Sequence, residues 1–244
     1  MKFTPHTPVE TAEMLAVIGV ESIDELFGTI PREHWVVGDL DLPAPKSEPE
    51  VLRYMKALAE LNATTDGVLS FLGAGAYDHY IPAAIPHLLD RGEFLTAYTP
   101  YQPEVSQGTL QAQFEFQTMV ARLLGMDVAN ASMYEGATAL AEACLMACRY
   151  TRRTGILVSS AVHPEYRRVL ETYAGPENVT EVQIDETGAT DLAALDGACS
   201  GDVGCVVVQS PNFFGVVEDT GAAVNAAHAN GALAVATFTE PLAF

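Results

Sequence analysis

The chain has 244 residues, 49% of them hydrophobic, which is enough to bury a sizeable core in one large domain with a small appendage. Its formal net charge is −20, and only three of its twelve basic residues are lysines, namely Lys2, Lys46 and Lys56. Binding to nucleic acid or to anionic membranes depends on clustered lysine and arginine, so this charge argues against both partners. No apolar run approaches the ~20 residues of a membrane span, and the start lacks a secretory signal, which predicts a cytoplasmic protein.

Two explanations account for the excess of acidic residues. Abundant surface carboxylates keep a protein hydrated in a cytoplasm rich in salt, which would indicate a halophilic source. Alternatively, the chain is an ordinary acidic bacterial protein. Folding or activity that did not improve between low and molar salt would count against the first explanation.

The four cysteines, Cys144, Cys148, Cys199 and Cys205, lie in Ala-rich or Val-rich surroundings. Such settings are typical of small buried thiols. Cys144 and Cys148 are four residues apart, which places them on one face of a helix. A metal site needs further Cys or His at ligand spacing, and none lies nearby, so no metal site is predicted.

Residues 1–65 are predicted to form a helical arm with Pro-containing connectors. At residues 7–10 and 47–50, a capping hydroxyl, a proline and a glutamate three residues after the cap satisfy the free amides of a helix start. Residues 22–25 repeat the cap and the glutamate. The helix after Ser47 has one apolar stripe, formed by Val51, Leu52, Met55, Leu58 and Leu61. We expect this arm to pack on something larger.

Residues 66–244 are predicted to form the large domain. A helix from 108 to 125 is expected to turn one apolar face inward, made of Ala112, Phe116, Met119, Val120, Leu123 and Leu124. Short apolar runs predict strands at 128–133, 155–158, 179–184, 204–208 and 232–236, with helices at 164–174, 191–199 and 219–229. Runs without polar alternation are typical of strands buried on both faces. The fold class is therefore α/β, a mostly parallel sheet covered by helices.

The last residues, 238–244, follow directly on a predicted buried strand. Neither a closing helix nor a polar tail comes after them. Natural domains seldom stop at such a place, so we expect the chain to be cut short within this domain.

In open α/β sheets, ligands bind beyond the carboxyl ends of the strands. Glu135 lies in the turn 134–139, whose small residues let backbone amides face an anion such as a phosphate. Its carboxylate opposes an anion, so a plain tight turn is the alternative. Asn212, in the segment 210–215, either hydrogen-bonds a ring hydroxyl of a ligand or simply makes the turn.

His163 stands at the predicted mouth of a helix, directly before Pro164. A histidine there either stacks on an aromatic ring or relays a proton, or it caps the helix. The residues leave these alternatives open.

The segment 98–108, YTPYQPEVSQG, differs from ordinary linker sequence. Two tyrosines and two prolines make a stiff loop that presents hydroxyl and aromatic surface to a partner or a ligand. The candidate contact residues in it are Tyr98, Thr99, Tyr101 and Gln107.

Residues 71–148, which begin FLGAGAYDHYIPAAIPHLLDRGEFLTAYTPYQPEVSQG, resemble the first subunit of split glycine decarboxylases. The start FTPHTPVETAEMLAVIGVESIDELF, HPEYR at 163–167 and SPNFFG at 210–215 are similar to the same family. The resemblance covers nearly the whole chain, and TAYTPYQPEVSQG is highly specific. It implies the fold of aspartate aminotransferase-like pyridoxal phosphate enzymes, and a chain that ends about halfway along the family's subunit.

The resemblance implies a subunit of glycine decarboxylase, the P protein of the glycine cleavage system. Glycine loses CO2 on pyridoxal phosphate, and the aminomethyl group passes to the lipoyl group of the H protein. A second subunit binds the cofactor through its lysine, and no lysine follows Lys56 here, so we expect no catalytic residue in this chain and no activity from it alone.

The resemblance also implies roles for the candidate residues. Tyr98, Thr99, Tyr101 and Gln107 would line the substrate side of the site across the subunit interface, with Glu135, His163 and Asn212 as further candidates. Glu240, between Thr239 and Pro241, stands where related subunits usually have Asp, which speaks against independent cofactor binding.

Two other functions fit the sequence. One is a distant aminotransferase or cysteine desulfurase relative whose lysine lies beyond residue 244, in a Ser-x-x-Lys or His-Lys segment. The other is a structural subunit that only stabilises its partner. In that case Tyr98→Phe and Tyr101→Phe would leave glycine decarboxylation untouched.

Overall fold

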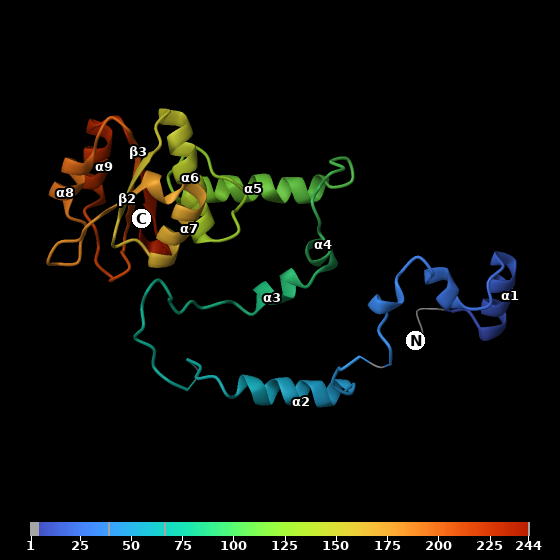
Figure 1. Ribbon diagram of the computed structural model, residues 1–244. Coiled ribbons are helices and arrows are strands. Elements are labelled where there is room, and N and C mark those ends of the chain that lie inside the picture. Colours follow the sequence, from blue (N-terminus) through green and yellow to red (C-terminus); the bar gives the residue numbers. More distant parts are fainter. Residues whose placement is uncertain (1–4, 39, 66, 244) are drawn as a thin grey trace. The chain divides into compact units, whose positions relative to one another are not determined.

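The computed structural model describes residues 5–38, 40–65 and 67–243. It divides into two compact units, Met1–Val68 and Leu69–Phe244 (Figure 1). No helix in the described part of the chain is long and apolar enough to cross a membrane.

The first unit is helical. It contains α1 (Pro8–Ile18), the 3-10 turns η1 (Ile23–Phe27) and η2 (Arg32–His34), and α2 (Glu48–Ala59). The predicted start of α1 is confirmed, because Glu10 accepts the Thr7 amide at 2.7 Å and Thr7 Oγ1 accepts the Glu10 amide at 3.3 Å. The Glu50 carboxylate likewise accepts the amide of Ser47, at 2.8 Å, before α2.

The cap predicted at residues 22–25 has a different form. Ser22 makes no side-chain cap at η1, and its hydroxyl donates to Glu25 Oε1 at 3.2 Å instead. The same carboxylate oxygen accepts the Glu21 amide at 3.2 Å. The glutamate of the pattern therefore accepts hydrogen bonds at the start of a 3-10 turn, but the serine hydroxyl accepts none from the turn's amides.

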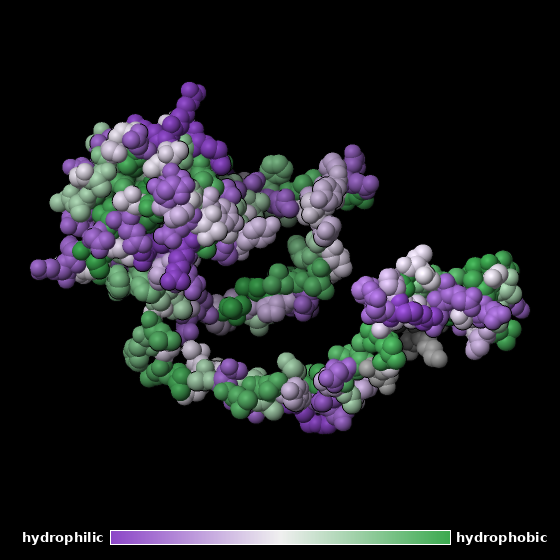
Figure 2. Space-filling view, in the orientation of Figure 1, coloured by the Kyte–Doolittle hydropathy of each residue, from purple (hydrophilic) through white to green (hydrophobic). Residues whose placement is uncertain are grey.

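The second unit begins with three helices, α3 (Ala84–Leu89), α4 (Gly92–Leu95) and α5 (Gln107–Leu123). The long helix predicted at 108–125 is confirmed, but its apolar face is not buried: Phe116, Met119 and Leu123 are 42%, 61% and 69% exposed. The periodicity predicts an apolar face, and no described residue of α5 is buried against a neighbouring element. Figure 2 shows hydrophobic residues at the surface of the segments that precede α6.

The predicted strand at 128–133 is wrong. This segment has no strand structure, because a local turn takes its place: Asn130 Oδ1 accepts the Ser132 amide at 3.0 Å. Ser132 adopts a φ of 118°, which a pleated strand does not allow. The chain then enters α6 (Gly136–Thr151) directly.

The remaining predicted strands are confirmed as a parallel sheet in the order β2-β1-β3-β4. Their bounds are Gly155–Ser159 for β1, Val179–Val182 for β2, Val203–Gln209 for β3 and Leu233–Thr237 for β4. β3 is buried along its whole length, as expected for a central strand without polar alternation.

Helices cover both faces of this sheet, so two hydrophobic clusters result (Figure 1). On one face, α6 and α7 (Pro164–Ala174) pack on Ile156, Val158, Cys205 and Val207. On the other face, α8 (Leu192–Ala198) and α9 (Thr220–Ala229) pack on strand residues that include Leu157, Val182 and Val206. The predicted α/β class is confirmed.

The cysteines lie in these clusters. Cys144 and Cys205 are fully buried, whereas Cys148 and Cys199 are half-buried and pack against the clusters. Burial raises the pKa of the Cys148 thiol to about 11. Within the described ranges, no group of three or more His, Cys, Asp or Glu is arranged to hold a metal ion.

The amino-terminal edge of the sheet is held by one cation. Arg153 Nη1 donates to the carbonyl oxygens of Val203, at 3.0 Å, and of Asn230, at 2.9 Å. Val203 is the first residue of β3 and Asn230 precedes β4, so a single guanidinium joins the amino-terminal ends of two adjacent strands.

Candidate functional site

The carboxyl ends of β1, β3 and β4 lie at one edge of the sheet, because all the strands are parallel. The segments that leave this edge are residues 160–163, 210–216 and 238–240. They carry two of the predicted site residues, His163 and Asn212.

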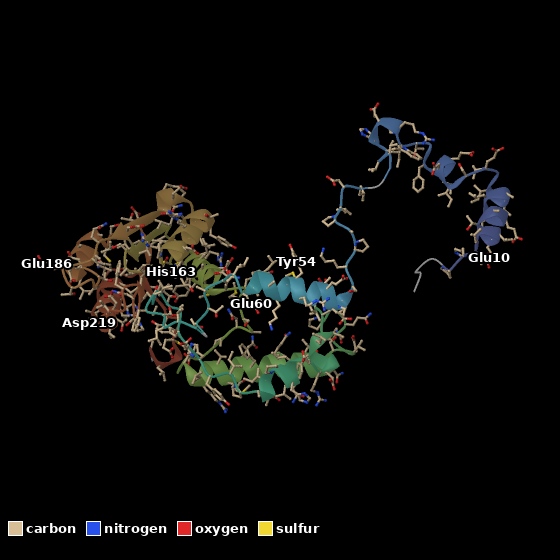
Figure 3. All side chains as sticks on the ribbon, turned by 90° about the horizontal axis from the view of Figure 1, so that it is seen from below. Glu10, Tyr54, Glu60, His163, Glu186 and Asp219 are labelled. Carbon is tan, nitrogen blue, oxygen red and sulfur yellow. The ribbon has the colours of Figure 1, made fainter. Side chains whose placement is uncertain are left out.

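His163 begins α7 and combines two of the roles left open by the sequence. Its Nδ1 accepts the Glu165 amide at 3.2 Å, which caps the helix. Its ring, labelled in Figure 3, lies 5.1 Å from the ring centroids of both Tyr166 and Phe213. Because Nδ1 is an acceptor, the neutral ring carries its proton on Nε2. The Nε2–H of His163 is therefore a hydrogen-bond donor within an aromatic cluster of His163, Tyr166 and Phe213.

The backbone of His163 is fixed by a buried side chain of β3. Gln209 is 3% exposed, and its Oε1 accepts the His163 amide at 2.9 Å. Gln209 is not among the site residues predicted from the sequence. The signal for it was a polar residue that ends an otherwise apolar strand.

Tyr166 joins this cluster to the start of α6. A Cβ on Gly136 would overlap the Tyr166 hydroxyl, so the absence of a side chain there permits the close approach. Burial, and secondly the charge of Glu135, raise the pKa of Tyr166. Through Tyr166, two predicted candidates, Glu135 and His163, lie near one another.

Glu135 caps α6 with its own carboxylate. The side chain accepts the Ala137 amide at 2.6 Å and the Thr138 amide at 3.0 Å. Its hydrogen bond with the Thr138 side chain is the largest cause that lowers the pKa of Glu135. An internal anion thus takes the amides that the sequence suggested for a phosphate.

Asn212 uses its whole side-chain amide within the chain. Nδ2 donates to Gly188 O and to Glu218 Oε1, both at 2.8 Å. Oδ1 accepts the amides of Phe214, at 2.9 Å, and of Val216, at 3.1 Å. Two donors and two acceptor positions are all that an asparagine offers, so its side chain organises the 212–216 turn.

The segment 98–108, called the tyrosine loop below, makes no described contact with His163 or Asn212 at this edge. Tyr98 and Tyr101 are 85% and 81% exposed, and Thr99 O accepts the Tyr101 amide at 2.8 Å. Gln107 is the exposed first residue of α5. Among the described residues, no hydrogen bond or ring contact joins this loop to His163.

A hollow of about 600 Å³ lies between α4, the start of α5 and Ala131. It is mostly apolar, with Phe94, Val105 and Phe116 among its lining residues. The four candidate residues of the tyrosine loop do not line it, although Ser106 and Gly108 do.

A glycine-containing segment also reaches the end of β4. A Cβ on Gly75 would lie 3.1 Å from Thr239 Oγ1, and His79 Nε2 lies 3.8 Å from Glu240 Oε2. Glu240, for which the resemblance implied an Asp in related subunits, therefore has a partner within the chain.

Comparison with known proteins identifies relatives over the whole chain. Residues 1–244 match the glycine cleavage system P-protein family. A probable glycine dehydrogenase (decarboxylating) subunit 1 from Geobacillus kaustophilus is 52% identical and aligns with 100% of this chain and 56% of its own length. The corresponding protein of Brevibacillus brevis is 51% identical, over 99% of this chain and 54% of its own. The chain thus spans about half the length of the curated relatives it matches.

The solved structures agree with these relatives. A crystal structure of glycine decarboxylase (P-protein) of the glycine cleavage system, in inhibitor-bound form, superposes with a TM-score of 0.83 at 48% identity, over 99% of this chain and 54% of that one. A sphingosine-1-phosphate lyase of Burkholderia pseudomallei K96243 superposes with a TM-score of 0.62 at 15% identity, over 84% of this chain and 50% of that one, which shows a shared fold alone.

Proposed function

The chain belongs to the glycine cleavage system P-protein family, and from this premise we propose that it is part of the first subunit of a glycine decarboxylase. The observation that carries the proposal is the match along all 244 residues to a family whose members, at 52% and 51% identity, are named subunit 1. In this function the subunit supports decarboxylation of glycine, and transfer of the aminomethyl group to the lipoyl group of an H protein.

We propose pyridoxal phosphate as the cofactor of the assembled enzyme, bound covalently by a second subunit. The residues of this chain do not fit covalent binding of that group. No lysine follows Lys56, the Glu135 carboxylate takes amides at the start of α6, and the Asn212 amide is fully used. A phosphate beside Glu135 would also meet a like charge. No reaction step is therefore assigned to a cofactor on this chain.

For the tyrosine loop we propose a role at the boundary with the second subunit, where Tyr98, Thr99, Tyr101 and Gln107 line the substrate side of the site. Exposure supports this role, since the two tyrosine rings are available to another chain. Large aromatic side chains with a polar tip are enriched at such interfaces. His163 and the exposed Glu135 remain further candidates at the sheet edge, and we propose that the buried Asn212 supports that edge from within.

Carbon exchange between glycine and bicarbonate tests the proposed function. The complete subunit that contains this chain is assayed with pyridoxal phosphate and lipoylated H protein, with and without its candidate partner. We expect exchange only when both subunits are present. Exchange by this subunit alone would overturn covalent binding of the cofactor by the second subunit, and no exchange with the partner would favour another enzyme of the same fold.

The tyrosine loop is tested in the same assay with Tyr98→Phe and Tyr101→Phe. We expect each variant to lower the exchange rate, by about tenfold for the loss of one positioned hydroxyl. Tyr150→Phe is the matched control, because Tyr150 is 78% exposed and lies on α6, outside the loop. Unchanged rates in both loop variants would favour a subunit that only stabilises its partner.

A further inference from the structure

Glu218 is a buried carboxylate that the proposed function does not use. It is 9% exposed, and within the described ranges no Lys, Arg or His forms an ion pair with it. Neutral donors surround it instead. The Thr190 amide donates to both carboxylate oxygens at 3.1 and 3.0 Å, and Asn212 Nδ2 donates to Oε1 at 2.8 Å. A buried charge held in this way is costly unless its surroundings are built for it.

A directed row of hydroxyls leads to the same carboxylate. Thr190 Oγ1 donates to Glu218 Oε1 at 3.0 Å, so the Thr190 hydroxyl has no second proton to give. Ser159 Oγ, 2.7 Å from Thr190 Oγ1, must therefore be the donor in that pair. Ser159 Oγ in turn accepts the Ala161 amide at 3.1 Å. Every donor in the row points toward Glu218, whose carboxylate is the acceptor that ends it.

The row joins two of the segments at the carboxyl edge. Ser159 ends β1, whereas Asn212 lies in the segment that follows β3. A backbone hydrogen bond joins the same two segments directly, because Ala161 O accepts the Phe213 amide at 2.9 Å. Phe213 packs edge-on against the His163 ring, at 5.1 Å. The Glu218 carboxylate is thus connected to Phe213 by two routes. One runs through Asn212, the neighbouring residue in the chain, and the other runs through Thr190, Ser159 and Ala161.

We propose that Glu218 is a positioning residue for the carboxyl edge of the sheet. By binding Thr190 and Asn212 together, it holds the segments after β1 and β3 in one arrangement. That arrangement fixes Phe213 against His163, and so the direction of the His163 Nε2–H. The importance of this edge for the enzyme rests on the proposed function, whereas the positioning itself does not.

The test is Glu218→Gln in the chain as it stands. The side-chain amide keeps the shape and the charge is lost, and its NH2 group then faces the Thr190 amide, which donates to Oε2 in the wild type. The readout is the proton NMR signals of the His163 ring, identified by their absence in His163→Gln. Nearby aromatic rings displace these signals, so a loosened Phe213 shifts or broadens them. Arg153→Gln is the matched control, because it removes hydrogen bonds at the opposite edge of the sheet.

We expect the His163 signals to move in Glu218→Gln and to stay in place in Arg153→Gln, both under conditions where the variant is folded. Thr190→Val, which removes the hydroxyl but keeps the amide donor, should move them in the same direction, and Thr190→Ser should restore them. Signals that stay in place in both Glu218→Gln and Thr190→Val, or that move equally in Arg153→Gln, would overturn the proposal.

The assembled enzyme separates this inference from the proposed function. With the partner subunit, we expect Glu218→Gln to lower kcat/KM for glycine exchange about tenfold and Arg153→Gln to leave it within about twofold. An equal loss in both variants would contradict positioning of the enzyme's site. If the wild-type complex shows no exchange, the proposed function fails, and the His163 signals alone still decide whether Glu218 positions the edge.

Discussion

The helices α5 and α6 follow one another in the chain and are nearly equal in length, with 17 and 16 residues, yet they differ in what they bury. α6 buries a face of mostly small residues against the sheet and α7: Ala137, Leu140, Ala141, Cys144 and Ala147. α5 buries no described residue, although its apolar side chains are larger. Apolar periodicity therefore predicts that a helix has an apolar face, and small residues on that face favour close packing within the same chain.

A charge on each helix should produce the largest contrast. Ala141 is fully buried, so Ala141→Glu places an unpaired carboxylate in the core and should cost ~3–5 kcal/mol, enough to unfold the chain. Ala112, on α5, is exposed, and Ala112→Glu should change the free energy of unfolding by less than ~0.5 kcal/mol. Urea unfolding followed by circular dichroism measures both. Similar losses in the two variants would show that α5 packs as tightly as α6.

Glycine replacements at the two helix starts should have opposite signs. A Cβ on Gly136 would overlap Tyr166, so Gly136→Ala should destabilise the chain by ~1–3 kcal/mol. Gly108 has no atom within 4 Å of its Cβ position, so Gly108→Ala should stabilise by ~0.5–1 kcal/mol. The measurement is the free energy of unfolding of each variant, and an equal sign for both would contradict the geometry at α6.

The smallest contrast concerns the helix caps. Glu135→Ala removes the carboxylate that accepts two amides of α6, whereas Ser106 makes no side-chain cap on α5. Thermal unfolding at neutral pH should show a lower Tm for Glu135→Ala and an unchanged Tm for Ser106→Ala.

The stability contributed by the Glu135 cap should depend on pH. The pKa of Glu135 is lower in the folded chain than its usual 4.5. The stabilisation that this carboxylate contributes is therefore present above the pKa that Glu135 has in the unfolded chain. It is lost as the pH falls through the lower pKa of the folded chain. The Tm difference between Glu135→Ala and the wild type should disappear in acid. A difference that persisted at low pH would exclude the charged cap as its source.

Strand prediction succeeded for the continuous apolar runs at 155–158, 204–208 and 232–236, which all became strands. Burial on both faces, which the same pattern predicts, holds for β1 and β3 but not for β4, whose residues are half-buried or exposed. The run at 128–133 failed because one side chain, Asn130, bonds its own backbone and makes a turn. The burial of α5 was not predictable, since it depends on a covering surface that periodicity does not describe.

The candidate site was predictable only in part, for a related reason. His163 and Asn212 follow strands directly, so the rule for strand ends finds them. Gln209 and Glu218 act through partners far along the chain: Gln209 binds His163, 46 residues away, and Glu218 binds Thr190, 28 residues away. Such pairings arise from the tertiary fold, and no local pattern marks them.

The hydrogen bonds of Arg153 mean that the two ends of the parallel strands are held by different kinds of interaction. At the amino-terminal ends, the Arg153 guanidinium binds two carbonyl oxygens of β3 and the segment before β4. At the carboxyl ends, neutral donors bind the Glu218 carboxylate. A loss of stability from substitutions at the carboxyl ends of the strands can then be offset by better packing at the amino-terminal ends, without altering the segments at the carboxyl ends. In evolutionary terms the sheet is modular, with one edge available to absorb the stability cost of change at the other.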